Sequence, residues 1–548
     1  MAPARKSRGT RVRRTGLAGR TGTVLLAAGI GVLSPASVAL PAWAQQSSVA
    51  PEAGGYFATP PPVDPGSLPS DDGKPDKTYE QKTSCVKRSE LDKGVELKNR
   101  PWGQDYLQID TVHKLMRGAN NSVGGGVTVA VIDTGVTPHP FFQGRVESGG
   151  DYVGPRTNNT PEGLEDCDGH GTEVAGIIAG NPPDPSTGFK GVAPDAKILS
   201  IRQSSQNYEV KKEDTPPATS SSGAPPGSSS SAPPGSQLPP QSNGAVGGRP
   251  ADADGTAPGQ DKGRQQEQGG TAGTLTTLAK AVIRATDKQA KVINMSVDNC
   301  RAATGAISKG EKELQAAVNY AVERDVVVVA AAGNVSENCP QNDQADPNMP
   351  KMIVTPPWFA DDVLSVAAIQ KDGSVADFSV HGPWISVAAP GTEIISLDPA
   401  AGSDGLANLT FDGSGKPGEI QGTSFAAPYV AGVAALVRAK FPDLKARAVM
   451  ERIKATAQHP AAPGGRDNFV GFGVIDPIAA LTASVPAEKA QPVQLPSDMP
   501  PADDRAKTPM IVALAGTGGG LVALLITLFV VHSIRRNRAV ATPGRKTP

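Results

Sequence analysis

Short apolar runs alternate with segments of helical periodicity between about residues 100 and 480. The apolar runs predict strands at Val127–Asp133, Lys197–Ile201, Val292–Ser296, Val326–Ala331, Val363–Ala368 and Trp384–Ala388. The segments between them predict helices over Gly169–Gly180, Leu275–Gln289, Glu311–Arg324 and Ser424–Lys440, with a shorter helical entry from Trp102 to Gly118. Apolar strands separated by helices are typical of a parallel sheet that is covered on both faces. We therefore expect an α/β domain over residues 101–482, with a mostly parallel central sheet in three layers.

Two segments break this pattern. Half of residues 211–270 are Pro, Gly or Ser, and the large apolar residues there are limited to Leu238 and Val246. Such a composition cannot bury enough surface to offset the entropy of ordering the chain. We predict a disordered insertion over about residues 205–272 and a Pro-rich linker over residues 483–509.

The N-terminal segment has the pattern of a secretory signal. Residues 1–20 contain seven basic side chains and no acidic one, an apolar stretch follows from Thr23 to Leu40, and Ala42-Trp43-Ala44 provides a cleavage site. We predict a signal peptide over residues 1–44, although an uncleaved anchor is the alternative. Residues 45–100 then form an extension that is Pro-rich at first and that we expect to pack on the folded domain.

The C-terminal segment predicts a membrane anchor. Residues 510–531 contain no charged side chain, and at about 1.5 Å per residue a helix of this length spans a bilayer core. Arg535, Arg536 and Arg538 follow directly. Since basic residues favour the cytoplasmic side, the tail of residues 532–548 is predicted to be cytoplasmic and the domain extracytoplasmic.

Composition narrows the class of protein. The chain of 548 residues has 53 basic and 54 acidic side chains, so no overall positive charge favours nucleic acid. The four cysteines, an even number, suit two disulfides in an oxidising compartment. Three pairings of these cysteines remain open at this point.

Three segments carry residues suited to nucleophilic catalysis. Asp133 ends an apolar strand, His170 stands in the run Asp168-Gly169-His170-Gly171-Thr172, and Ser424 opens a helix within Gly422-Thr423-Ser424. A serine hydroxyl is a poor nucleophile until a base removes its proton, and a carboxylate holds a histidine in the tautomer that serves as this base. A fourth segment ends the strand Val326–Ala331 at Asn334, whose amide can donate to a developing oxyanion.

Each residue alone has an ordinary explanation. An aspartate at a strand end is often a turn residue, a lone histidine is often structural, and a serine before an Ala-rich helix is ordinarily an N-cap. The four segments together, in the order Asp, His, Asn, Ser, resemble the subtilisin-like serine proteases. This resemblance implies that Asp133 orients the base, His170 is the general base and acid, Ser424 is the nucleophile and Asn334 is the oxyanion donor.

The same resemblance leaves the substrate open. Substrates of the family lie extended beside the strand that ends at Asn294-Met295-Ser296, where many relatives continue with a pair of glycines. Here Val297-Asp298-Asn299-Cys300 follows instead. We expect a polypeptide substrate and no cofactor, and we assign no metal-ligating residues. The cleavage motif and any calcium sites are left open by the sequence.

A narrower resemblance is to the mycosins, membrane-anchored subtilases of actinobacterial type VII secretion. It is carried by the signal, the strand Ile198–Ser204 with its following insertion, the Pro-rich linker and the single C-terminal helix. It implies membrane partners from a type VII secretion complex, with roles in substrate processing and complex stabilisation. The alternative is a protein that is mainly a structural scaffold of such a complex, with secondary proteolytic activity.

The subtilase resemblance also implies a disulfide pattern and a fate for the extension. In a subtilase sheet the strands that end near Ser296 and Asn334 are neighbours, which implies the pairs Cys300–Cys339 and Cys85–Cys167. Many subtilases have a folded propeptide that is removed. The prolines of residues 51–69 are incompatible with such a domain, so we predict that the extension stays attached, with a short removable propeptide as the alternative.

Overall fold

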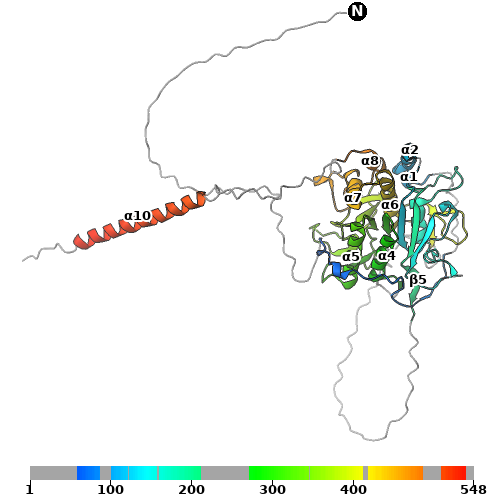
Figure 1. The fold of residues 1–548 in the computed structure, drawn as a ribbon, viewed down its shortest axis with the longest axis horizontal. Helices are drawn as coiled ribbons and strands as arrows, with labels where there is room; N and C mark the ends of the chain where they lie inside the picture. Colours follow the sequence, from blue (N-terminus) through cyan, green and yellow to red (C-terminus); the bar gives the residue numbers. More distant parts are fainter. Residues whose placement is uncertain are drawn as a thin grey trace, which may run out of the picture. The chain divides into compact units, whose positions relative to one another are not determined.

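The central element of the fold is a seven-stranded parallel sheet in the order β12-β11-β9-β7-β2-β4-β3 (Figure 1). The computed structural model describes residues 58–86, 100–120, 122–156, 159–211, 271–344, 346–411, 417–485 and 508–538. The strands are β2 (Thr128–Asp133), β3 (Val146–Asp151), β4 (Lys197–Arg202), β7 (Val292–Met295), β9 (Val327–Ala331), β11 (Leu364–Ile369) and β12 (Val387–Pro390). The α/β fold class expected from the sequence is confirmed.

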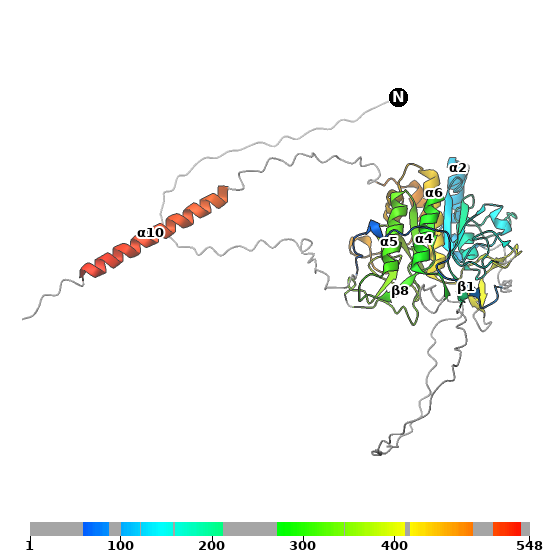
Figure 2. The ribbon, with the colours of Figure 1, turned by 60° about the horizontal axis from the view of Figure 1, so that its bottom comes forward.

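Helices form a layer on each side of this sheet. The main ones are α3 (His170–Ala179), α4 (Leu275–Asp287), α5 (Lys309–Glu323) and α6 (Thr423–Lys440). Helix α6 packs against α3 and crosses strands β7, β9 and β11, whereas α4 and α5 pack side by side (Figures 1 and 2). The shorter helices are α1 (Trp102–Tyr106), α2 (Ile109–Asn120), α7 (Ala446–Ala455) and α8 (Pro477–Thr482). All residues of β7 and β9 are buried between these layers, which explains their continuous apolar sequence.

Local sequence signals set the starts of the outer helices. At α4 the side chain of Thr274 accepts from the backbone N–H of Thr277, whose own hydroxyl accepts from the N–H of Thr274. At α5, Ser308 and Glu311 make the same reciprocal pair of bonds. Such capping boxes satisfy backbone donors that the first helical turn leaves without partners.

A second, smaller sheet corrects one predicted boundary. Strands β5 (Ser205–Val210) and β6 (Thr271–Ala272) lie at the two ends of the segment predicted to be disordered, and β5 pairs antiparallel with β1 (Tyr79–Gln81) of the N-terminal extension. Residues 205–210 and 271–272 are therefore ordered. The strand β1 that pairs with β5 is more than a hundred residues away in sequence, and β6 pairs with β5 across the whole insertion, so local composition did not reveal either strand. The rest of the predicted insertion, residues 212–270, lies outside the described residues.

The described part of the extension packs along the domain. The guanidinium of Arg284 on α4 donates to Asp71 at 2.8 Å, and Gln315 on α5 donates to the carbonyl of Pro61 at 2.8 Å. A disulfide joins Cys85 to Cys167. Residues 58–86 thus contact both outer helices, the small sheet and the segment before α3. The predicted signal peptide and the first residues of the extension lie outside the described ranges.

Several other elements differ from the sequence expectation. The helical entry is split into α1 and α2, because Gln108 adopts a left-handed backbone with φ 53°. The last strand of the sheet, β12, is displaced toward the C-terminus relative to the predicted Trp384–Ala388. Strand β3 was not expected, since its sequence contains two glycines and two acidic residues. The remaining short strands, also not expected, are β8 (Asn299–Ala302), β10 (Met352–Thr355), β13 (Ser396–Leu397), β14 (Leu406–Ala407), β15 (Leu409–Phe411) and β16 (Pro417–Glu419).

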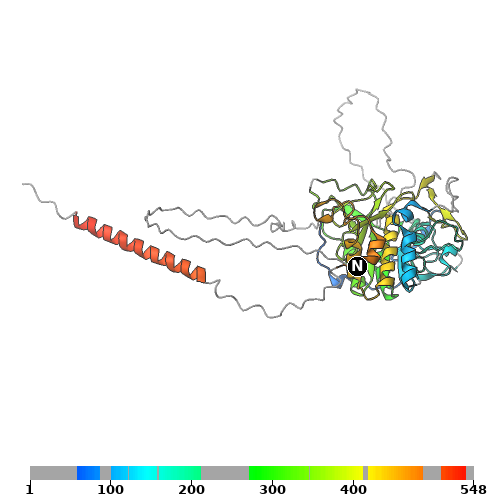
Figure 3. The same ribbon diagram turned by 90° about the horizontal axis from the view of Figure 1, so that it is seen from above.

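Helix α10 (Thr508–Arg538) corresponds to the predicted membrane anchor (Figure 3). Within the described ranges, it is the one helix with a stretch long and apolar enough to cross a membrane, Gly518–Arg536, with a mean hydropathy of 1.7. The predicted linker before it lies almost entirely outside the described residues.

Candidate active site

The carboxyl ends of neighbouring strands bring the candidate residues together. Asp133 is the last residue of β2, which pairs with β7, and β7 pairs in turn with β9, whose chain continues to Asn334. Helices α3 and α6, which pack against each other, begin at His170 and Thr423. Ligand and catalytic groups of α/β sheets collect at this edge.

Asp133 and His170 form a buried pair. The Nδ1 atom of His170 lies 2.7 Å from Oδ1 of Asp133, and the same carboxylate oxygen accepts the backbone N–H of Thr134 at 2.8 Å. The two side chains are almost completely shielded from solvent. A histidine that donates from Nδ1 to a carboxylate presents Nε2 as its basic atom. The geometry therefore suits a general base.

Ser424 lies in the first turn of α6, next to this pair. It is 3% exposed, and the ring of the following residue, Phe425, has its centre 5.0 Å from the imidazole of His170. The start of α6 is thus held against the histidine. The structure brings the predicted nucleophile and the predicted base to the same place.

Asn334 is fixed by a residue to which the sequence argument had given no role. Its Oδ1 atom accepts two hydrogen bonds from Thr423, from the backbone N–H at 3.0 Å and from the hydroxyl at 2.9 Å. The same hydroxyl accepts the backbone N–H of Gly333 at 3.1 Å. Because Oδ1 is the accepting end, Nδ2 is the donor end of the amide. The position of Thr423, directly before Ser424, was the signal available in the sequence.

The buried carboxylate of Asp166 connects the segments that carry Asp133 and His170. Asp166 accepts the hydroxyl of Thr134 at 2.7 Å, the backbone N–H of Gly169 at 2.7 Å, and both the N–H and hydroxyl of Thr172, at 2.8 and 2.6 Å. Burial raises the pKa of Asp166, while the hydrogen bonds from Thr172 and Thr134 act in the opposite direction. Through these hydrogen bonds Asp166 connects the end of β2 to the start of α3. Sequence reasoning missed this residue, although it lies only four positions before His170.

Gly169 is required by the close packing before His170. Its φ of 90° is in the left-handed region, and an added Cβ would lie 2.7 Å from a side-chain carbon of Pro399 and 3.3 Å from Val86. A side chain here would push α3 away from the loop after β13 and from the extension.

The segment that departs from the glycine pair of other subtilases lies beside Gly333, the residue before Asn334. Asp298 is 3% exposed, and its carboxylate is 3.3 Å from the place that a Cβ on Gly333 would occupy. The disulfide Cys300–Cys339 joins the chain after β7 to the chain after β9. Both disulfides have the connectivity expected from the sequence. In the part of the chain that the structure describes, no group of three or more His, Cys, Asp or Glu side chains could hold a metal ion.

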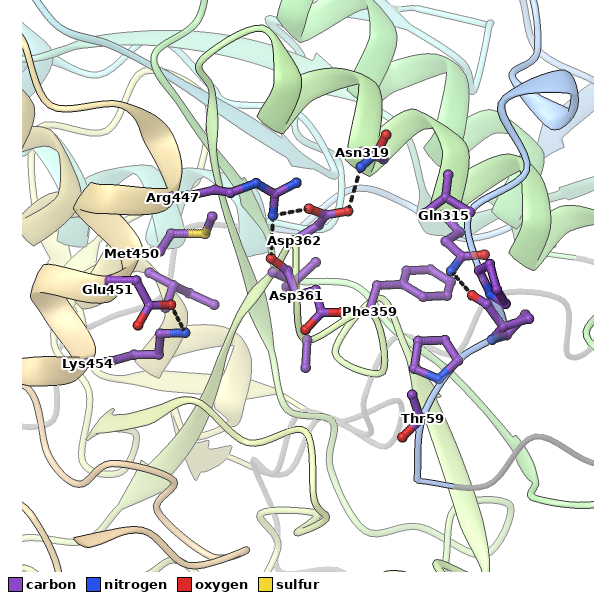
Figure 4. A pocket seen from close by; sticks show the side chains of 17 residues that line it. Thr59, Gln315, Asn319, Phe359, Asp361, Asp362, Arg447, Met450, Glu451 and Lys454 are labelled. Carbon is purple, nitrogen blue, oxygen red and sulfur yellow. Dashed lines mark hydrogen bonds and ion pairs between the residues drawn. The ribbon is translucent and has the colours of Figure 1, made fainter. Parts of the chain in front are cut away.

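A separate cavity of about 840 Å³ lies away from this site, near the amino end of β11 (Figure 4). Its walls come from residues 59–63 of the extension, from α5, from the loop before β11 and from α7. Arg447 on α7 reaches across to Asp362 at 2.6 Å, and Asn319 on α5 donates to the same carboxylate at 3.0 Å. None of the four candidate catalytic residues lines this cavity.

Comparisons with known proteins agree with this arrangement. A family model described as the subtilase family matches residues 124–473. Mycosin-1 of Mycobacterium tuberculosis is 41% identical over 78% of this chain and 83% of its own. A solved structure of the serine protease MycP1, described as an essential component of the type VII (ESX-1) secretion system, has a TM-score of 0.61 at 37% identity and covers 78% of this chain and 100% of that one. A chain in an intact ESX-5 inner membrane complex has a TM-score of 0.61 at 35% identity, over 87% of this chain and all of that one.

Proposed function

The chain belongs to the subtilase family of serine endopeptidases and, within it, to the mycosins, and from that premise we propose that Ser424 attacks the substrate carbonyl, with His170 as its base and Asp133 as the partner of the base. The observation that carries this proposal is the 2.7 Å bond between His170 Nδ1 and Asp133, next to the start of the helix that bears Ser424. The substrate class is a polypeptide.

In the first step Nε2 of His170 takes the proton of the Ser424 hydroxyl as the serine oxygen bonds to the carbonyl carbon. The imidazolium that forms is stabilised by Asp133, which is already in contact and needs no rearrangement. His170 then gives the proton to the leaving amine, and the acyl group stays on Ser424. Water, activated by the same histidine, releases the acid and restores the serine.

Negative charge develops on the carbonyl oxygen during both steps. We assign the side-chain donor for this oxygen to Asn334, whose amide orientation is supported by the two hydrogen bonds from Thr423. A fixed donor of this kind stabilises the transition state more than the substrate, because the charge exists mainly in the transition state.

A fluorophosphonate probe tests the assignment of the nucleophile, because it labels an activated serine without needing the natural substrate. The purified protein should be labelled at Ser424, and Ser424→Ala should abolish both labelling and peptide hydrolysis. Ser365→Ala is a matched control, because it also removes the hydroxyl of a buried serine, one that donates to the backbone carbonyl of Trp384. This variant should keep wild-type labelling. Labelling retained in Ser424→Ala would refute the assignment.

The mycosin relatives also suggest a location and partners. We propose that α10 anchors the protein in the membrane, with residues 532–548 in the cytoplasm and the catalytic domain on the extracytoplasmic side. The relatives named above are a component of an ESX-1 system and part of an ESX-5 inner membrane complex. We propose that this protein likewise joins a type VII secretion complex, where it cleaves secreted polypeptides and stabilises the assembly.

Complementation of a deletion strain separates the two roles in secretion. Ser424→Ala should leave the complex assembled and its secreted substrate uncleaved. A variant without residues 508–548 should fail to join the membrane complex while its catalytic domain still reacts with the probe. If Ser424→Ala also dissolves the complex, the stabilising role does not exist apart from catalysis.

A further inference from the structure

The helix that carries Ser424 lacks one of its own hydrogen bonds. In an α-helix the carbonyl of residue i accepts the N–H of residue i+4. For Ser424 that residue is Pro428, which lies inside α6 and has no N–H. A proline ring inside a helix also crowds the carbonyl four residues before it. The carbonyl of Ser424 therefore needs a donor from outside the i+4 pattern of α6.

Ser296 supplies that donor. Its hydroxyl lies 2.8 Å from the carbonyl oxygen of Ser424, and both residues are buried, at 2% and 3% exposure. Ser296 directly follows β7, so the central sheet holds the first turn of α6 at the position where the proline removed the intrahelical bond.

A second buried residue fixes the direction of this bond. The side-chain N–H of Asn294, which is completely buried within β7, donates to the hydroxyl of Ser296 at 2.9 Å. A hydroxyl has one proton. Because Ser296 accepts from Asn294, its proton is directed to Ser424. The amide oxygen of Asn294 is buried and makes no hydrogen bond, an arrangement whose free-energy cost calls for an explanation.

We propose that Ser296 and Asn294 are positioning residues for Ser424. Together they form a chain of hydrogen-bond donors from the sheet, which replaces the helical N–H that Pro428 lacks. The proposal rests on the proposed function, in which Ser424 is the nucleophile. The chain acts on the backbone of Ser424 and thereby fixes where its Cβ and hydroxyl stand relative to His170.

The test uses the full-length protein and two assays, labelling of Ser424 by a fluorophosphonate and hydrolysis of a peptide. Ser296→Ala should slow labelling and lower kcat by about tenfold, with KM within about twofold, because one hydrogen bond to a buried carbonyl is lost. Adding Pro428→Ala in the same chain should recover most of this loss, since residue 428 then has an N–H for the carbonyl of Ser424. If Ser296→Ala lowered activity only by leaving a cavity, Pro428→Ala would not restore the activity, because residue 428 lies on the other side of the Ser424 carbonyl.

Ser365→Ala is the matched control and should keep wild-type labelling. Wild-type labelling in Ser296→Ala, or a loss that Pro428→Ala does not recover, would overturn the positioning role and leave the assignment of Ser424 intact. Absence of labelling in the wild type would instead refute the proposed function, and this inference with it. If Ser296→Ala does not fold, Asn294→Ala is measured in its place, with the same expected loss in kcat and the same recovery by Pro428→Ala.

Discussion

The hydroxyl of Thr423 lies 2.9 Å from Oδ1 of Asn334, and the backbone N–H of the same threonine donates to the same oxygen. The residue before the proposed nucleophile, Ser424, thus orients the residue proposed to bind the oxyanion. Because Thr423 bonds to Asn334 and directly precedes Ser424, any shift in the start of α6 moves the proposed nucleophile and the proposed oxyanion donor together.

Asn334→Ala should lower kcat by about 10²–10³-fold and leave KM nearly unchanged, because the hydrogen bond from its amide is made mainly in the transition state. Steady-state kinetics on any cleaved peptide measure this. Asn319→Ala removes an amide of the same kind at the remote contact with Asp362 and should keep its kcat. An unchanged kcat in Asn334→Ala would remove this residue from the mechanism.

Asp133→Asn should lower kcat by about 10⁴-fold with little change in stability. The amide is the same size as the carboxylate, but it can donate to His170 and so favours the wrong tautomer of the ring. Thermal unfolding and peptide hydrolysis should be measured on the same preparation. A loss of activity that parallels a loss of folded protein would show that the effect is structural.

Removal of the Cys300–Cys339 bond should reduce the free energy of unfolding by about 4 kcal/mol, from the entropy of the loop of 39 residues that it closes. The double variant Cys300→Ser/Cys339→Ser can be compared with the wild type in denaturant. Non-reducing peptide mapping checks the pairing itself, and a peptide that links Cys85 to Cys300 or to Cys339 would contradict it.

Acidification should destabilise the fold through His113. Burial lowers the pKa of this residue below its ordinary value of 6.5, and the ring contacts the carbonyl of Val192 at 3.1 Å. The unfolded chain then binds more protons than the folded one once the pH falls below about 6.5. The contribution of the neutral His113 ring to the free energy of unfolding is fully present above that pH. It is lost as the pH falls toward the pKa of His113 in the folded protein.

Melting curves at pH 7.5 and 5.5 measure this effect. The wild type should lose more in Tm than His113→Gln, which has no titrating ring and keeps an N–H for Val192. An equal loss in both proteins would assign the pH dependence to other groups, among them His139, whose pKa is also lowered by burial.

The N-terminal extension should remain on the active protein. Its described part is held by the strand pair β1–β5, by the ion pair between Asp71 and Arg284 and by the disulfide at Cys85. N-terminal sequencing of the membrane form should therefore begin near Gln45, and activity should appear without a lag. A start near residue 100 would show that the extension is a removable propeptide.

The sequence was sufficient where the fold depends on local patterns. Continuous apolar runs placed strands β2, β7 and β9 because these strands are buried on both faces. The Asp-His-Ser order and the family motifs located the candidate site, because each motif stands at a strand end or a helix start.

What the sequence did not reveal depends on contacts between distant segments. Strand β5 has a polar sequence, and it forms because it pairs with β1 of the extension on one side and with β6 on the other, with its own Tyr208 buried. Asp166 was not recognised since its role appears only when Thr134 and Thr172 are brought to the same carboxylate. Ser296 lies in a segment that the sequence analysis named, but its hydrogen-bond partner, the carbonyl of Ser424, is 128 residues away in sequence.

The small sheet of β1, β5 and β6 makes the segment between Val210 and Thr271 a suitable place for an engineered insertion. Both ends of the segment are anchored in the same sheet, so the active-site loops do not depend on the length of chain that joins them. A reporter domain or an affinity tag inserted there should therefore leave the candidate catalytic residues in place.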